Sequence, residues 1–325
     1  MAVKIVTDST ATLVPEQIAQ YDLKQVTLFV VQDGKAEPEI DMDYHEYYKR
    51  LMDLENLPTT SQPTTASMVE AFEEVLDAGN DVLGIFVSGA LSGTMDGART
   101  AASIIEERRP EAKGRIALVN SQSNGMGLTY PVIEAAKLAE EGAGLEECRE
   151  MAEYITSCTR FLFAPKSLEH LARGGRIGRA SAMLGTALKL CPILGPDKIT
   201  GAVHTYAKVR TYPKALNTIK DKMLADIEAS GGLKGLCVHY IPERAEGETF
   251  LKDVLLPAIR AKYPKIETPI FAIPPTIGTH VGPAIGLVYW TNNPMIKENV
   301  EGMGLVESAK GRLSERVQEL RGKRS

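Results

Sequence analysis

The feature that most constrains the fold is an unbroken apolar run, Val-Leu-Gly-Ile-Phe-Val, at residues 82–87. An unbroken run indicates a strand that is covered on both faces, because a half-exposed strand alternates apolar and polar residues. Residues 3–6, 25–31 and 116–119 also have the composition of strands. Helical patterns lie between these strands, at residues 43–54, 65–78, 94–109, 124–141 and 145–157. This alternation predicts an α/β domain with a parallel, doubly wound sheet.

The second half of the chain has a different pattern. Strands are predicted at residues 161–164, 192–194, 202–209, 235–240, 268–273 and 285–290, and helices at 167–173, 179–189, 212–229 and 244–262. Several of these strands are joined by turns, which predicts a mixed or antiparallel sheet. We therefore expect an N-terminal domain at 1–158, a C-terminal α/β domain at 159–290, and a helical extension at 291–325. The extension is amphipathic, with apolar residues at helical spacing: Val306, Ala309, Leu313, Val317 and Leu320.

Composition narrows the classes of function. The 325 residues include 37 basic and 42 acidic ones, a net charge of −5, which disfavours a nucleic-acid-binding protein. The apolar runs are too short to span a bilayer and the first residues lack the pattern of a signal peptide, so a cytoplasmic protein is expected. The widely spaced Cys148, Cys158, Cys191 and Cys237 predict reduced, mostly buried thiols, and the five histidines form no metal-ligand motif.

Two hydroxyl-rich segments precede predicted helices. In the first, Pro58–Thr64, we expect Thr64 to cap the following helix. The second, Ser88–Thr94, follows the buried strand 82–87 at the edge where α/β sheets bind ligands. Gly93 allows close approach of the backbone and Thr94 is a candidate cap. Both segments combine hydroxyls with a helix start, which suits an anion, although a plain capped helix entry explains them equally.

Two glycine-rich segments lie in the second half. Arg176 follows the pair Gly174-Gly175, which lets the chain turn and displays a guanidinium suited to a carboxylate or phosphate. A solvated basic turn is the alternative. His280 lies between Gly278 and Gly282 just before the last predicted strand. The glycines favour a place where the backbone passes close to another group, and a purely structural histidine stays open.

Taken together, these motifs resemble those of the DegV family of fatty-acid-binding proteins. The resemblance covers about nine-tenths of the chain and rests on the order and spacing of six short signatures. They are Thr-Asp-Ser at 7–9, Thr-Ser-Gln-Pro at 60–63, Leu-Ser-Gly-Thr at 91–94, Gly-Gly-Arg-Ile at 174–177, Val-Arg-Thr at 209–211 and His-Val-Gly-Pro at 280–283.

The resemblance implies two α/β domains with one long-chain fatty acid bound between them and no further cofactor or metal. Its carboxylate would be bound by six residues, namely Thr60, Ser61, Ser92, Gly93, Arg176 and His280. In bacterial relatives such a protein presents the acid to a separate fatty acid kinase, and Lys208 and Arg210 match positions where this partner could dock. Transient membrane contact is compatible with this role. We also expect five residues to line the acyl tunnel: Met183, Leu184, Ala187, Ile277 and Val281.

Two alternative functions remain open. A Ser-dependent hydrolase or acyltransferase would use Ser92 as nucleophile, His280 as base and Asp8 as the orienting carboxylate. Against it, the segment Gly89-Ala-Leu-Ser92-Gly lacks the Gly-x-Ser-x-Gly pattern of a nucleophile elbow. A nucleic-acid-binding regulator would use Arg173, Arg176 and Arg179, which the acidic net charge opposes.

Overall fold

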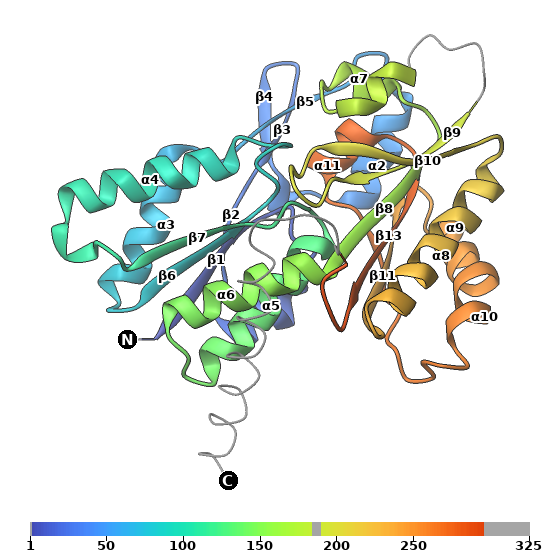
Figure 1. Ribbon diagram of the computed structural model, residues 1–325. Helices are drawn as coiled ribbons and strands as arrows, with labels where there is room; N and C mark the ends of the chain where they lie inside the picture. Colours follow the sequence, from blue (N-terminus) through green and yellow to red (C-terminus); the bar gives the residue numbers. More distant parts are fainter. Residues whose placement is uncertain (1, 184–189, 296–325) are drawn as a thin grey trace.

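The computed structural model describes residues 2–183 and 190–295 and places them in three sheets (Figure 1). The expected extension at 291–325 and the end of the expected helix 179–189 lie largely outside these ranges. The predicted α/β class with one parallel and one mixed sheet is confirmed. Within the described residues, no helix has both the length and the apolar composition needed to cross a membrane.

The first sheet is parallel and has the order β2-β1-β6-β7. Its strands are β1 (Val3–Asp8), β2 (Lys24–Val26), β6 (Asp81–Phe86) and β7 (Ile116–Asn120). Val82 and Phe86 point to one face, where α3 (Thr65–Asp77) and α4 (Thr94–Arg108) lie. Leu83 and Ile85 point to the other face, which α5 (Met126–Glu140) and α6 (Leu145–Cys158) cover. Both faces of this sheet are therefore buried, as the unbroken apolar run predicts.

The second sheet is mixed and has the order β10-β9-β8-β13-β11-β12, with one parallel pair, β11 and β12. Its strands are β8 (Thr159–Pro165), β9 (Cys191–Pro196), β10 (Val203–Val209), β11 (Leu233–Ile241), β12 (Ile270–Ala272) and β13 (Ala284–Thr291). One face packs against α8 (Tyr212–Ala229) and the segment 244–259. The helix predicted at 244–262 is continuous from 244 to 259 and has a π-helical middle, as α9 (Arg244–Thr249), a π-helical turn (Phe250–Leu255) and α10 (Leu256–Ile259).

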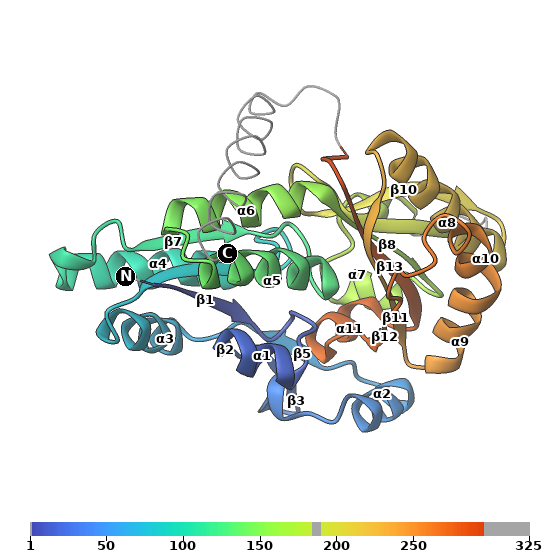
Figure 2. The ribbon, with the colours of Figure 1, turned by 90° about the horizontal axis from the view of Figure 1, so that it is seen from below.

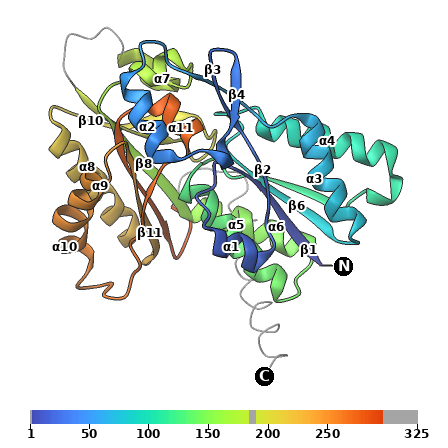
Figure 3. The same cartoon turned by 180° about the vertical axis from the view of Figure 1, so that it is seen from behind.

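The other face of this sheet is covered by elements from distant parts of the chain. They are α2 (Tyr44–Asp53), α7 (Glu169–Arg173) and α11 (Pro275–Val281), which lie side by side in Figures 1 and 3. The hydroxyls of Tyr47 and Tyr48 reach α11, where Tyr47 bonds Thr279 at 2.5 Å and Tyr48 donates to the Ile273 carbonyl at 2.7 Å. α2 thus fixes the position of α11. The sequence pattern did not predict this helix.

A small antiparallel sheet connects the two large ones. It has the order β4-β3-β5, with β3 (Phe29–Gln32), β4 (Lys35–Pro38) and β5 (Thr59–Ser61). The single strand expected at 25–31 is wrong: its residues divide between β2 and β3. The chain leaves the parallel sheet after Val26, where the Leu28 amide donates to Ser9 Oγ instead of continuing the strand ladder.

The remaining elements are short. α1 (Pro15–Tyr21) packs beside α5, visible from below in Figure 2, and 3-10 turns occur at Glu39–Asp41, Pro110–Ala112 and Gly178–Met183. The last of these turns replaces the start of the helix expected at 179–189. The chain passes from α6 directly into β8 at residues 158 and 159. The domain boundary expected there stays a prediction, since α2 from the first half packs on the second half.

Candidate functional site

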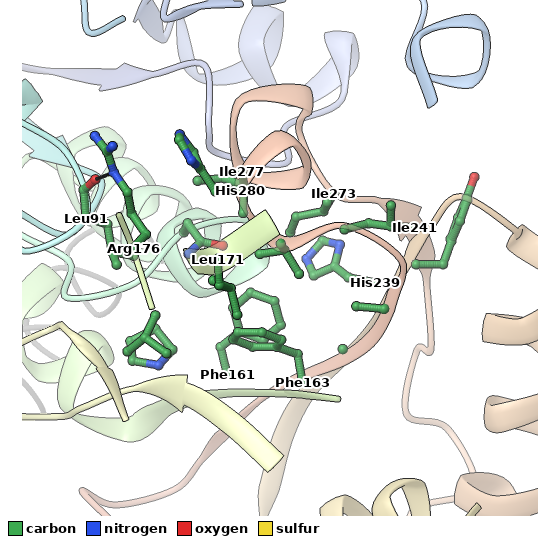
Figure 4. Close-up of a pocket in the computed structure, with 17 residues that line it drawn as sticks. Leu91, Phe161, Phe163, Leu171, Arg176, His239, Ile241, Ile273, Ile277 and His280 are labelled. Carbon is green, nitrogen blue, oxygen red and sulfur yellow. Dashed lines mark hydrogen bonds between the residues drawn. The ribbon is translucent and has the colours of Figure 1, made fainter. Parts of the chain in front are cut away.

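A cavity lies on the face of the mixed sheet that α7 and α11 cover (Figure 4). It encloses about 630 Å³ of atom-free space, counted out to its open mouth. Only Leu91 and Asn124 of its 17 lining residues come from the first half of the chain. The cavity therefore belongs mainly to the second half and is closed by loops of the first.

The walls of the cavity are apolar. Strand β8 contributes Phe161 and Phe163 to these walls, and β13 contributes Ala284 and Gly286. The helical side of the cavity is formed by four residues of α7, α11 and the chain before α11: Leu171, Ile273, Ile277 and Val281. Gly286 is needed because a Cβ there would lie 2.6 Å from the ring of Phe161. Of the five residues expected to line the tunnel, Ile277 and Val281 line this cavity. Met183 is buried but is not a lining residue, and Leu184 and Ala187 lie outside the described residues.

His280 is at one end of the cavity, near the C-terminal end of α11. Its Nε2 lies 2.7 Å from Thr60 Oγ1 on β5, so the ring connects the small sheet to the cavity. Nδ1 lies against Gly174, where a Cβ would come within 2.1 Å of it, and has no hydrogen-bond partner among the described residues. Burial is the main reason that the pKa of His280 is lowered to about 4, and the charges of Arg176 and His170 act in the same direction. The ring is therefore neutral near pH 7.

Arg176 lies next to His280 at the same end. Its guanidinium donates to the Gly174 carbonyl at 2.6 Å and, through Nε, to the Leu91 carbonyl at 3.3 Å (Figure 4). Gly175 has a φ of +72°, which a side chain would strain, whereas Gly174 is needed for the close approach of His280. The two glycines thus have different roles in one turn that places Arg176, whose side chain is exposed, at this end of the cavity.

The two hydroxyl-rich segments meet at this end. Gln62 packs on Gly93, because a Cβ at Gly93 would lie 1.9 Å from Gln62 Oε1. Thr64 caps α3 as predicted, accepting from the Ser67 amide at 3.0 Å. The expected cap at Thr94 is wrong: Ser92 Oγ accepts from the Thr94 amide at 3.3 Å, and α4 begins at Thr94 itself. Ser92 is partly exposed beside Leu91, which lines the cavity.

The strand β5 determines where the side chains of Thr60 and Ser61 point. Thr59–Ser61 was expected to be a loop entering a helix, but it pairs with β3 as a strand. Neighbouring side chains of a strand point to opposite faces, so Thr60 faces His280 while Ser61 is exposed. The structure thus brings Thr60, Arg176 and His280 to one end of the cavity, with Ser92 and Gly93 on the adjoining loop.

Asp8 does not join this group. It is fully buried, and its carboxylate accepts from Thr10 at 2.6 Å and from the Val87 amide at 2.7 Å. Burial raises the pKa of Asp8 to about 6, against the lowering effect of these hydrogen bonds. The arrangement expected for a serine hydrolase is absent from the described residues, since His280 bonds Thr60 and Ser92 Oγ lies 2.8 Å from Thr94 Oγ1.

The basic residues outside the cavity do not form one surface. Arg173 pairs with Glu169 at 3.1 Å, while Arg176 lies at the end of the cavity and donates to the Leu91 carbonyl. Lys208 and Arg210 are exposed on and just beyond β10, the edge strand of the mixed sheet. Among the described residues, no group of His, Cys, Asp or Glu has the arrangement of a metal site.

Three polar residues of this region were missed from the sequence. Glu39 is fully buried and accepts from the Thr276 amide and hydroxyl, both at 2.6 Å, which anchors the start of α11. Burial raises the pKa of Glu39, and the Asp8 charge raises it further. His239 and Asn124 line the cavity. Nothing in the local sequence marks these residues, because the hydrogen-bond partners of the Glu39 and His239 side chains are 30 or more residues away and Asn124 faces the cavity.

Comparison with known proteins gives a consistent result. The family model described as "Uncharacterised protein, DegV family" matches residues 2–292. The chain belongs to the DegV family. A DegV domain-containing protein of Clostridium acetobutylicum is 36% identical over 91% of this chain and all of that protein. A second, from Clostridium perfringens, is 34% identical over 89% of this chain and 99% of its own length.

Solved DegV structures have the same fold. The chain matches a fatty-acid-binding DegV family protein of Thermus thermophilus with a TM-score of 0.74 and 28% identity, over 89% of this chain and 99% of the other. It matches DegV of Bacillus subtilis, described as a fatty acid binding protein, with a TM-score of 0.76 and 29% identity over the same shares.

Proposed function

We propose that this DegV family chain binds one long-chain fatty acid in the cavity. The observation that carries the proposal is an apolar cavity with one polar end, where an unpartnered His280 nitrogen lies beside the Arg176 guanidinium. Burying about fourteen methylenes at roughly 0.8 kcal/mol each is worth about 11 kcal/mol before the cost of association. The descriptions of the Thermus thermophilus and Bacillus subtilis relatives support the same ligand class.

The polar end suits a carboxylate in three ways. Because the pKa of His280 is lowered to about 4, the ring is neutral, and a proton on Nδ1 is available to an acceptor when Thr60 donates to Nε2. Arg176 adds a positive charge, and the 15-residue helix α4 starts beside Ser92 and Gly93 with the positive end of its dipole. We propose that Thr60, Ser61, Ser92, Gly93, Arg176 and His280 form the carboxylate site, with Ser61 at its exposed rim.

The proposal extends to the fate of the bound acid. A separate fatty acid kinase would transfer the γ-phosphoryl group of ATP to a carboxylate oxygen, which yields an acyl phosphate and ADP. In this scheme the chain is a carrier and not an enzyme, its only ligand is the fatty acid, and it works in the cytoplasm with transient contact to membranes. The exposed Lys208 and Arg210 are the proposed docking residues for the kinase.

Lipid extraction tests the binding proposal. Fatty acid is extracted from freshly purified protein and identified by mass spectrometry, and the delipidated protein is then offered palmitate. We expect one equivalent of bound acid, reduced binding in Ser92→Ala and Arg176→Ala, and unchanged unfolding midpoints. Delipidated protein that takes up no fatty acid would refute the proposal.

A second assay tests the carrier role. The loaded protein is mixed with ATP and a bacterial fatty acid kinase, and acyl phosphate is trapped with hydroxylamine. We expect the variant Lys208→Glu/Arg210→Glu to bind palmitate normally but to yield less acyl phosphate. Normal yield from this variant would remove these residues from the docking site, and no yield from the wild type would remove the carrier role.

A further inference from the structure

The cavity contains a second unpartnered polar atom besides His280 Nδ1. Asn124 lines the cavity with 5% of its surface exposed, and its Oδ1 has no hydrogen-bond partner in the described ranges. A buried amide oxygen normally has a partner, because leaving it unpaired forfeits its bonds to water. An alkyl chain beside Asn124 would not supply one.

The other buried polar group of this wall is already satisfied. The Met126 amide donates to His239 Nε2 at 3.1 Å, so Nε2 is the acceptor. Nδ1 then carries the proton and donates to the Phe271 carbonyl at 3.2 Å. Burial lowers the pKa of His239 to about 4, which agrees with a neutral ring that has both nitrogens in use. His239 therefore leaves Asn124 as the group that still needs a partner here.

Asn124 is placed along the acyl path and not at the carboxylate end. It is two residues before Met126, which contacts His239, and Gly125 between them packs on His239 and Ile273. Figure 4 shows His239 and Ile273 apart from Arg176 and His280, which mark the polar end. A ligand with its carboxylate at His280 and its chain along Ile273 and His239 would thus pass Asn124.

We propose that Asn124 is a specificity residue for a fatty acid with a hydroxyl group part-way along its chain. A hydroxyl donates to the amide oxygen and accepts from the amide nitrogen, so it satisfies either end of the side chain. Sites built to bind a substrate hydroxyl discriminate against the analogue that lacks it, since their own polar group is then left unpaired. This inference rests on the proposed fatty-acid function and narrows its substrate class.

A competition experiment tests the inference. Delipidated wild-type protein is offered stearic acid together with monohydroxystearic acids that have the hydroxyl near the carboxyl end, in mid-chain or near the methyl end. We expect the mid-chain hydroxy acid to be preferred about tenfold, the effect of one hydrogen bond. Equal binding of stearic and all hydroxystearic acids would overturn the inference while leaving fatty-acid binding intact. If no acid binds at all, the proposed function itself fails.

Substitution of Asn124 is the second part of this test. Asn124→Leu replaces the amide by an apolar group of similar size and should abolish or reverse the preference, with stearic acid still bound. Gln122→Leu is the matched control, because Gln122 is on the same loop but donates to the Ile199 carbonyl outside the cavity. A preference that survives in Asn124→Leu, or is lost equally in Gln122→Leu, would contradict the role of Asn124. The wild-type competition decides the matter even if Asn124→Leu does not fold.

Discussion

The two large sheets of this chain differ in how their faces are covered. The parallel sheet β2-β1-β6-β7 has helices on both faces, contributed by its own strand-helix units. The mixed sheet has its longer helical connections, α8 and the segment 244–259, on one face. Its second face depends on α2, α7 and α11, which cover it incompletely and leave the cavity. A binding site thus arises where a sheet face is covered only by short helices, two from its own connections and one from the first half of the chain.

Filling the cavity should have the largest effect. Ala284 faces the cavity from β13, whereas Ala164 on the paired strand β8 faces the helices. We expect Ala284→Phe to reduce bound palmitate more than tenfold, because the ring occupies the acyl path, and Ala284→Val to shorten the longest acid that binds. Mass spectrometry of extracted lipid measures both.

Ala164→Val is the matched control for these variants. It adds the same volume as Ala284→Val to the close-packed face and should cost about 1–3 kcal/mol of unfolding free energy. The acyl chain lengths bound by the folded protein should not change. If Ala164→Val shortened the bound acid as much as Ala284→Val does, the two faces would not differ as described.

Removing apolar volume should destabilise the protein more on the helix-covered face of the mixed sheet than on its cavity face. Leu287 is fully buried under the helices and Ile273 borders the cavity. Leu287→Ala should cost about 2–5 kcal/mol of unfolding free energy, and Ile273→Ala less, since part of its surroundings is already empty. Urea unfolding of delipidated protein gives both values, and equal losses would contradict the comparison.

The pH dependence of stability should have opposite signs in the two regions. The unfolded chain binds a proton at each of His239 and His280 near pH 6.5, whereas their folded pKa values are about 4. The free energy of unfolding therefore falls as the pH drops from 6.5 to 4. Asp8, the last residue of β1 in the parallel sheet, has a pKa raised from 3.8 to about 6, so its contribution falls as the pH rises over that interval.

Two variants separate these contributions. His280→Gln should flatten the loss of stability on acidification, while Asp8→Asn should make it steeper, each by about 1–3 kcal/mol between pH 6 and pH 4. Urea unfolding across this pH range is the measurement. A steeper profile in His280→Gln, or a flatter one in Asp8→Asn, would show that the signs are wrong.

Helix caps should show the smallest effect. Thr64 Oγ1 accepts from Ser67 at 3.0 Å at the start of α3, and Thr211 Oγ1 accepts from Lys214 at 3.4 Å at the start of α8. Thr64→Ala should cost about 1 kcal/mol of unfolding free energy and Thr211→Ala less, because its hydrogen bond is longer. Neither Thr64 nor Thr211 lines the cavity, so palmitate content should not change. A loss of palmitate in either variant would argue that the helix-covered faces influence the site.

The difference between local and long-range contacts explains which elements could be predicted from the sequence. The strand 82–87, the helices around it and the cap at Thr64 follow from patterns within a few residues, and the structure has them. The errors fall where distant groups intervene. The strand expected at 25–31 is divided because the Leu28 amide donates to Ser9. The short helix α11 was missed because Glu39, Tyr47 and Tyr48 anchor it from far along the chain.

The sequence by itself determined the α/β class, the different character of the two sheets and the motifs that mark the family, since periodicity and turn residues act over short distances along the chain. Only the tertiary structure decided which polar groups meet. Thr60 and His280 are 220 residues apart and bond at 2.7 Å, Asp8 turns to Thr10 and Val87, and Asn124 is left in the cavity wall without a partner among the described residues. The physical reason is that a cavity is a property of the packing between elements, and no local pattern of residues specifies the space that packing leaves open.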